Sequence, residues 1–230
     1  MKLQFTGIGA AYYPVLGSNC AFFEHEDRLF LLDCGESTFK AMFARSEIFR
    51  YKRITVLITH LHADHIGSLG SFLSFCKNVL NKKATLIAEE ETVVHVLSEC
   101  GVQPDLYHFT TDFSQCNADG FSIQPVRVKH ASDMLCCGFL IECDGEKTYY
   151  SGDTCLIPED ILHSFLSGEI QTMYQECTYL NTDSPSHCSL QKLCAWIPEK
   201  ERDRVYCMHL GGDFRGDIYA AGFRIPEIVS

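Results

Sequence analysis

The chain has 230 residues, of which 46% are hydrophobic and 21% are charged, as in an ordinary globular protein. This length predicts a single compact domain over residues 1–230. The formal net charge of −11 repels polyanions over long range and argues against indiscriminate binding to nucleic acid. A small substrate, or a larger substrate of which only one end is bound, is more compatible with this negative charge than a long polyanion is.

Cysteine usage and hydropathy indicate a cytoplasmic protein with no membrane partner. No apolar run reaches the roughly 18 residues of a membrane span, and the first residues do not resemble a signal peptide. Thirteen cysteines are an odd number, and several lie inside apolar runs, as Cys34 and Cys76 do. This scatter predicts reduced thiols in the core rather than a disulfide framework.

The first half of the chain alternates predicted strands and helices. Residues 28–34 and 53–59 are short, nearly continuous apolar runs, which favours strands buried on both faces. Between them, apolar residues at helical spacing predict a helix over 36–49. The alternation continues with a helix over 67–81, a strand over 84–88 and a helix over 89–100 that stops at Gly101.

The second half begins with strands. Residues 121–130 and 138–154 alternate apolar and polar side chains, and the pair Asp144-Gly145 marks a hairpin turn. Helices are predicted over 157–166 and 189–196, and a closing strand over 204–210 precedes a glycine-rich loop. We therefore expect an α/β sandwich built from two halves.

The stretch LITHLHADHIGSLG places three histidines and an aspartate just after a buried strand. Residues two apart on an extended segment point the same way, so His60 and His62 can converge on one ion. The following turn directs Asp64 and His65 toward a second ion. Imidazole and carboxylate are ligands that zinc takes, and a metal would offset the cost of crowding these groups.

This T-H-x-H-x-D-H pattern resembles the metallo-β-lactamase superfamily, whose members fold as a four-layer αβ/βα sandwich. The resemblance extends from the glycine-rich start and LLDCGEST to the C-terminal loop. It implies three further ligands after strands, and the sequence supplies His130, Asp153 and His209. By the same resemblance, His60, His62 and His130 hold one metal, Asp64, His65 and His209 hold the other, and Asp153 bridges them.

Two divalent ions about 3.5–4 Å apart can share a hydroxide and stabilise an anionic transition state, which suits hydrolysis of phosphodiesters, thioesters and amides. Zinc is the default metal, while Mn²⁺ and Fe²⁺ stay open. True β-lactamases of the superfamily commonly carry a cysteine where this chain has Asp153. An oxygen ligand there favours the phosphodiesterase and thioesterase branches.

The segment MYQECTYLNTDSPSHCSLQKL resembles transfer-RNA 3′ processing enzymes and related phosphodiesterases of the ribonuclease Z type. In those relatives an acidic strand end, here Glu176, precedes a histidine close to the metals, here His187. The resemblance implies that His187 is a general acid that protonates the leaving alkoxide, and that His187 and Asp64 are the catalytic residues. The alternative is a surface or helix-capping histidine, with Ser186 or Ser189 capping the helix.

One difference from transfer-RNA 3′ endonucleases narrows the range of expected substrates. Transfer-RNA 3′ endonucleases usually insert a long RNA-gripping arm between the positions of His130 and Asp153, and a single hairpin consumes most of this interval here. We therefore expect a metal-dependent phosphodiesterase acting on a small or cyclic phosphodiester or nucleotide. RNA is a less favoured substrate than a small phosphodiester. The sequence leaves open whether the protein forms a homodimer. The isolated residues His25, His95, His108 and His163 are expected to be structural or solvated.

Three other functions stay open at this point: a transfer-RNA 3′ endonuclease-like ribonuclease, a thioesterase similar to glyoxalase II, and a metal-binding sensor without catalysis.

Overall fold

A computed structural model describes residues 1–229, apart from the side chains at positions 46 and 47. Contacts divide the chain into two compact units. The N-unit contains Lys2–Asp112 together with the residues that follow Pro226, and the C-unit contains Phe113–Pro226 together with Met1. The second half of the sequence, which begins with the strand predicted over residues 121–130, starts close to this boundary. The single-domain assignment for residues 1–230 stays a prediction.

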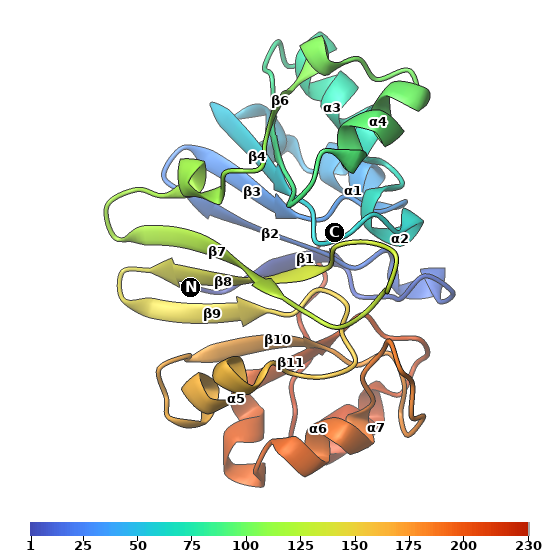
Figure 1. Ribbon diagram of the computed structural model, residues 1–230, viewed down its shortest axis with the longest axis vertical. Helices are drawn as coiled ribbons and strands as arrows, with labels where there is room; N and C mark the ends of the chain where they lie inside the picture. Colours follow the sequence, from blue (N-terminus) through green and yellow to red (C-terminus); the bar gives the residue numbers. More distant parts are fainter. Residues whose placement is uncertain (230) are drawn as a thin grey trace. The chain divides into compact units, whose positions relative to one another are not determined.

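The N-unit is built on a six-stranded mixed sheet in the order β1-β2-β3-β4-β5-β6 (Figure 1). Strands β1 to β3 pair antiparallel, whereas β3 to β6 pair parallel. Because β3 and β4 are interior strands of this sheet, their side chains are buried almost throughout, as their apolar sequences predict. The strands are β1 (Gln4–Gly7), β2 (Cys20–His25), β3 (Arg28–Leu32), β4 (Arg53–Leu57), β5 (Thr85–Ile87) and β6 (His108–Thr110).

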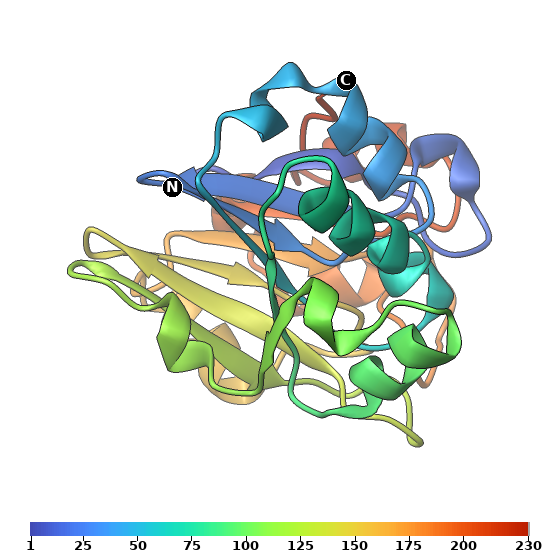
Figure 2. The same cartoon turned by 90° about the horizontal axis from the view of Figure 1, so that it is seen from above.

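Helices cover one face of this sheet (Figure 2) and close a continuous apolar core. Phe72 and Leu73 from α3 pack with Leu31 and Val56 from the two central strands, and all four are fully buried. The α-helices of the N-unit are α1 (Thr38–Ala44), α2 (Ala63–Ile66), α3 (Leu69–Asn78) and α4 (Thr92–Glu99), joined by the 3-10 turns η1 (Pro14–Leu16), η2 (Ser46–Phe49) and η3 (Pro104–Leu106).

The C-unit is built on a five-stranded sheet in the order β11-β10-β9-β8-β7 (Figure 1). The predicted hairpin turn joins β8 to β9, and Asp144 and Gly145 both have the positive φ angles, 51° and 82°, that such a two-residue turn requires. Pro125 lies in β7, an edge strand, where its missing N–H costs no ladder bond. The strands are β7 (Phe121–Arg127), β8 (Cys137–Cys143), β9 (Glu146–Tyr150), β10 (Thr172–Glu176) and β11 (Val205–Met208).

Three α-helices and two 3-10 helices complete the C-unit. Ser189 caps α6 with its hydroxyl, which accepts a hydrogen bond from the backbone N–H of Lys192 at 3.4 Å. Of the two serines considered from the sequence, Ser189 is therefore the cap. The helices are α5 (Glu159–Leu166), α6 (Leu190–Trp196), α7 (Arg215–Ala220), η4 (Phe113–Cys116) and η5 (Glu199–Arg204).

Several predicted boundaries were wrong. The helix expected over 36–49 ends at Ala44, because Arg45 is extended (φ −88°, ψ 109°) and the chain continues as the 3-10 turn η2. The helix expected over 67–81 covers only Leu69–Asn78, and the separate short helix α2 lies before it. The glycine-rich C-terminal loop leads into α7, which the sequence interpretation missed together with β1, β2 and β6, whereas β10 ends at Glu176 as the resemblance implied. The stop at Gly101 is confirmed, where φ is 81°.

Ten of the thirteen cysteines are buried, as expected of core thiols. Burial raises the pKa of Cys20 and that of Cys76 to about 12, so neither forms a reactive thiolate near neutral pH. Among the described residues, no helix has both the length and the apolar character that a membrane crossing requires.

Thiol titration tests this burial. We expect Cys100, which is exposed, to react first with Ellman's reagent at pH 8, followed by the half-buried Cys143 and Cys194. The ten buried thiols should react only after unfolding in guanidinium chloride. Cys100→Ser should remove the fastest phase alone, and rapid reaction of most thiols in the native protein would contradict the packing.

Candidate metal centre

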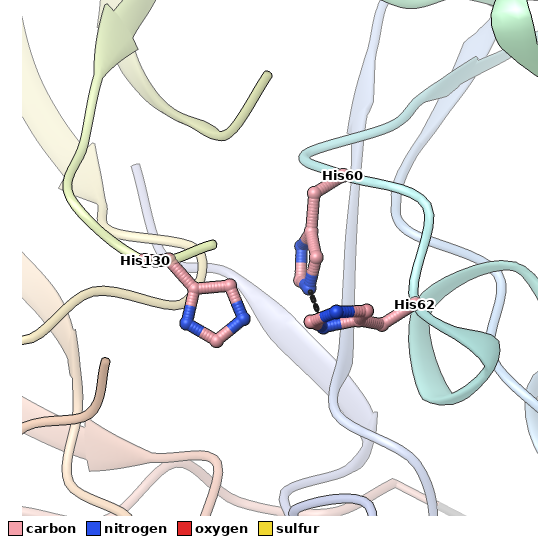
Figure 3. Close-up of side chains that lie close together, drawn as sticks. All are labelled: His60, His62 and His130. Carbon is pink, nitrogen blue, oxygen red and sulfur yellow. Dashed lines mark hydrogen bonds between the residues drawn. The ribbon is translucent and has the colours of Figure 1, made fainter. Parts of the chain in front are cut away.

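In the N-unit, the predicted motif lies between the end of β4 and the short helix α2. His62 caps α2 in an extended conformation (φ −65°, ψ 150°), and its carbonyl accepts the N–H groups of His65 and Ile66 at 3.0 and 3.1 Å. The rings of His60 and His62 lie beside one another, with their centroids 4.6 Å apart. Nε2 of His60 lies 3.0 Å from Nδ1 of His62 (Figure 3).

A buried carboxylate orients the other histidine of the motif. Asp33 follows β3, is fully buried, and accepts hydrogen bonds from the Thr59 N–H at 2.8 Å and from Nδ1 of His65 at 2.8 Å. Burial raises the pKa of Asp33, and the charge and hydrogen bonds of its partners oppose that shift. With Nδ1 of His65 engaged, Nε2 is the ring atom able to bind a metal, and it lies 3.3 Å from Oδ2 of Asp64.

Thr59 extends the same hydrogen-bond network to His60. Its hydroxyl lies 2.9 and 3.0 Å from the two Asp33 oxygens and 3.0 Å from Nδ1 of His60. Because the hydroxyl donates its single proton to the carboxylate, its oxygen accepts from Nδ1–H of His60. Nε2 of His60 is therefore the atom left for a metal.

The turn after β3 packs directly against α2. The Cys34 N–H donates to the carbonyl of His65 at 2.7 Å. A Cβ added to Gly35 would lie 1.9 Å from the carbonyl oxygen of Asp64. Only glycine allows this approach, so the DCG turn sets the position of the helix that carries Asp64 and His65.

In the C-unit, the candidate residues lie at one edge of the sheet. Strands β9, β10 and β11 are mutually parallel, and β7 runs in the same direction because β7-β8 and β8-β9 are both antiparallel pairs. The carboxyl ends of these four strands therefore meet at the same edge, which is where ligands of open α/β sheets commonly bind. The residues that follow or end them are His130, Asp153, Glu176 and His209.

Asp153 is the centre of this group. Its Oδ2 lies 3.3 Å from Nε2 of His209 and 3.8 Å from Nε2 of His130, and all three side chains are at most 3% exposed. Nδ1 of His130 donates to the carbonyl oxygen of Ser186 at 2.9 Å. Nδ1 of His209 lies 3.0 Å from the hydroxyl of Thr178, which itself donates to Oε1 of Glu176 at 2.5 Å.

His187 is held beside this group by Glu176. Its Nδ1 hydrogen-bonds Oε1 of Glu176 and lies 4.0 Å from Oδ2 of Asp153. Desolvation lowers the pKa of His187, but the hydrogen bond and charge of Glu176 and the charge of Asp153 outweigh it and raise the pKa above its usual value. Glu176 is fully buried and also accepts the N–H of Thr154, which fixes the loop that carries Asp153.

The donor atoms within each unit fit a divalent metal ion. Two ligands at about 2.0–2.1 Å from a tetrahedral ion lie roughly 3.3 Å apart. The spacing is 3.0 Å for His60 and His62, 3.3 Å for Asp64 and His65, and 3.3 Å for Asp153 and His209. Imidazole nitrogen and carboxylate oxygen are suited to zinc and to neighbouring first-row metals.

Each unit thus brings together the predicted site residues that it contains. The N-unit gathers His60, His62, Asp64 and His65, and the C-unit gathers His130, Asp153, His187 and His209. The sequence interpretation missed the acceptors Asp33, Thr59 and Thr178. A signal for Asp33 was present, since it ends an apolar run that predicts a strand beside the one that precedes His60.

Comparison with solved structures confirms the α/β fold expected from the motif. The metallo-β-lactamase fold protein YhfI from Bacillus subtilis superimposes with a TM-score of 0.75 at 17% identity, over 96% of this chain and 90% of that one. The chain therefore has the metallo-β-lactamase fold, and the histidine and aspartate donors gathered within each unit are of the kind that hold a divalent metal ion in metallo-hydrolases.

A family model makes the assignment specific. The model described as Anti-Pycsar protein Apyc1 matches residues 1–224, and the chain belongs to this family. Anti-Pycsar protein Apyc1 from Paenibacillus harenae is 27% identical over 226 residues, covering 92% of this chain and 90% of that protein. Human zinc phosphodiesterase ELAC protein 1 is 35% identical over 74 residues, covering 32% of this chain and 20% of that protein. The expected resemblance to phosphodiesterases of the ribonuclease Z type is confirmed.

Substitution of Gly35 tests the contact beneath Asp64. Gly35→Ala should lower the free energy of unfolding by about 1–3 kcal/mol, because the added methyl group overlaps the Asp64 carbonyl. Urea denaturation measures this change. The matched control is Gly216→Ala in α7, where a Cβ meets nothing within 4 Å and stability should be unchanged or higher. Equal stability of both variants would contradict the contact.

Substitution of Asp33 tests the orientation of His65. Asp33→Asn should weaken metal binding by about 10- to 100-fold, because the amide no longer offers a second carboxylate oxygen to Nδ1 of His65. Competition titration with a chromophoric chelator gives the dissociation constants. Asp27→Asn is the control, since Asp27 forms only partly exposed ion pairs with Arg53 and Lys52 and its change should be negligible.

Proposed function

We propose that this chain is a dinuclear metal-dependent phosphodiesterase that hydrolyses a small cyclic phosphodiester such as a cyclic nucleotide. The observation that carries the proposal is the pair Glu176–His187 beside Asp153 and His209, in a chain that belongs to the Anti-Pycsar protein Apyc1 family. An oriented imidazole next to metal ligands suits cleavage of an ester whose leaving group is a poor one.

The proposed ligand sets follow the motif. His60, His62 and His130 would hold one ion, Asp64, His65 and His209 would hold the other, and Asp153 would be shared by both. The spacing of donor atoms within each unit supports these sets, as does the engagement of Nδ1 in His60, His65, His130 and His209 by other protein groups. Zinc is the proposed metal, because these sets combine imidazole with carboxylate.

Bound divalent metal ions would activate water for attack and offset charge on the phosphoryl oxygens. The protein's own contribution at the leaving group comes from His187. Glu176 accepts Nδ1–H of the imidazolium and stabilises its charge, so Nε2–H is the proton available for the departing alkoxide. When that proton moves, His187 becomes neutral and the ribose oxygen leaves as a hydroxyl group.

The substrate assignment rests on the short interval between His130 and Asp153. The β8-β9 hairpin, which covers Cys137–Tyr150, occupies most of it, and the sequence leaves no room there for a long RNA-gripping arm. The net charge of −11 adds long-range repulsion against a large polyanion. A cyclic nucleotide carries one phosphoryl charge and fits both constraints.

The role of His187 is tested by varying the leaving group. With a cyclic nucleotide, His187→Ala should lower kcat by about 100-fold or more, because an alkoxide needs a proton in order to leave. With bis(p-nitrophenyl) phosphate the loss should be much smaller, because nitrophenolate departs without one. Equal losses with both substrates would indicate a structural role for His187.

Two controls accompany this experiment, one for the choice of histidine and one for the need for metal. His163→Ala changes an exposed histidine of α5 and should leave both rates unchanged. Removal of metal with a chelator should abolish both activities, and added Zn²⁺ should restore them. A glutathione thioester hydrolysed far faster than any phosphodiester would contradict the proposed function and favour the thioesterase alternative.

A further inference from the structure

We propose that Lys192 is a positioning residue that holds the segment 183–186 in place and thereby fixes the ring of His130. Lys192 lies in α6, and its ammonium donates to the carbonyl of Ser184 at 3.2 Å and pairs with Asp183 at 2.8 Å. Three quarters of its side chain is buried. The proposal rests on the proposed role of His130 as a metal ligand.

The segment held by Lys192 touches two candidate site residues. The carbonyl of Ser186 accepts Nδ1–H of His130 at 2.9 Å. The hydroxyl of Ser184 lies 3.2 Å from the backbone N–H of His187 and 3.3 Å from that of Ser186. Displacement of Ser184 would therefore move an acceptor away from His130 and loosen the turn that leads to His187.

The carbonyl of Ser186 also determines which ring nitrogen of His130 carries the proton. A carbonyl oxygen can only accept, so Nδ1 must be the donor and Nε2 the nitrogen with a lone pair. Nε2 is the atom that lies 3.8 Å from Oδ2 of Asp153. A backbone acceptor serves this purpose only while its chain segment stays in position.

The two contacts of Lys192 differ in how strongly they restrain the segment 183–186. Asp183 is 91% exposed, and such an ion pair contributes little because water competes for both groups. The bond to the Ser184 carbonyl is partly buried and charge-assisted, so it is the stronger restraint. Lys192 does not touch the reacting atoms and acts only through the segment.

The variant Lys192→Met retains most of the apolar stem and removes the donor. We expect its dissociation constant for Zn²⁺ to rise by about 10-fold, at the lower end of the range for groups that orient a ligand. Turnover of a cyclic nucleotide should fall through kcat rather than KM. Lys192→Arg keeps a donor and should recover most of both losses, whereas Asp183→Asn and the exposed control Lys200→Met should match the wild type.

A spectroscopic readout in the metal-free protein separates this inference from the proposed function. Long-range ¹H–¹⁵N correlation spectra report the tautomer of His130. In the wild type at pH 8 the proton should reside on Nδ1, and in Lys192→Met this preference should be lost. The readout requires neither metal nor activity, so it remains informative if the proposed substrate is wrong.

Two results would overturn the inference. The first is an unchanged His130 tautomer together with unchanged zinc affinity in a folded Lys192→Met. If Lys192→Met does not fold, Lys192→Gln takes its place, because its shorter amide cannot replace the ammonium. The second contradicting result is a folded Lys192→Gln that keeps the Nδ1–H tautomer of His130 and binds zinc like the wild type.

Discussion

The candidate site depends on one constraint, which is that a protein group occupies Nδ1 of His60, His65, His130 and His209 and so leaves Nε2 of each ring for a metal. Both units use a buried carboxylate and a threonine for this purpose, and the C-unit adds the Ser186 carbonyl, which holds His130. Asp33 accepts from Thr59 and His65, and the Thr59 oxygen in turn faces His60. Glu176 accepts from Thr178 and His187, and the Thr178 oxygen in turn faces His209. The same hydrogen-bonding pattern thus recurs in two sequences with no obvious repeat.

Strand order explains why these groups can meet within each unit. Asp33 and His60 follow the neighbouring parallel strands β3 and β4, while Asp153, Glu176 and His209 follow or end β9, β10 and β11. Parallel strands place their carboxyl ends at one edge, so polar residues distant in sequence become neighbours without a long polar element crossing the core. The apolar strands provide the rigid support, and short loops carry the chemistry.

Much of this arrangement could be predicted from the sequence. Local sequence patterns predict the motif after Thr59, the buried strands on either side of it and the hairpin at Asp144. Each of these features is determined by residues close together in the sequence, so it could be recognised without knowledge of the tertiary structure. The acceptors of the ring N–H groups could not be predicted as easily. The partner of His130 is a backbone carbonyl at Ser186, which any residue type could supply, so only the path of the chain reveals it. Helix α7 was missed because Gly216 lies in its first turn and weakens the helical pattern.

The central claim is most directly tested by a crystal structure of the zinc-loaded protein with anomalous data collected at the zinc edge. The account predicts metal bound through Nε2 of His65, His130 and His209, each at about 2.0–2.1 Å, while their Nδ1 atoms keep the protein acceptors. Zinc bound through Nδ1 of any of these three rings, or zinc bound elsewhere with the rings uncoordinated, would contradict it.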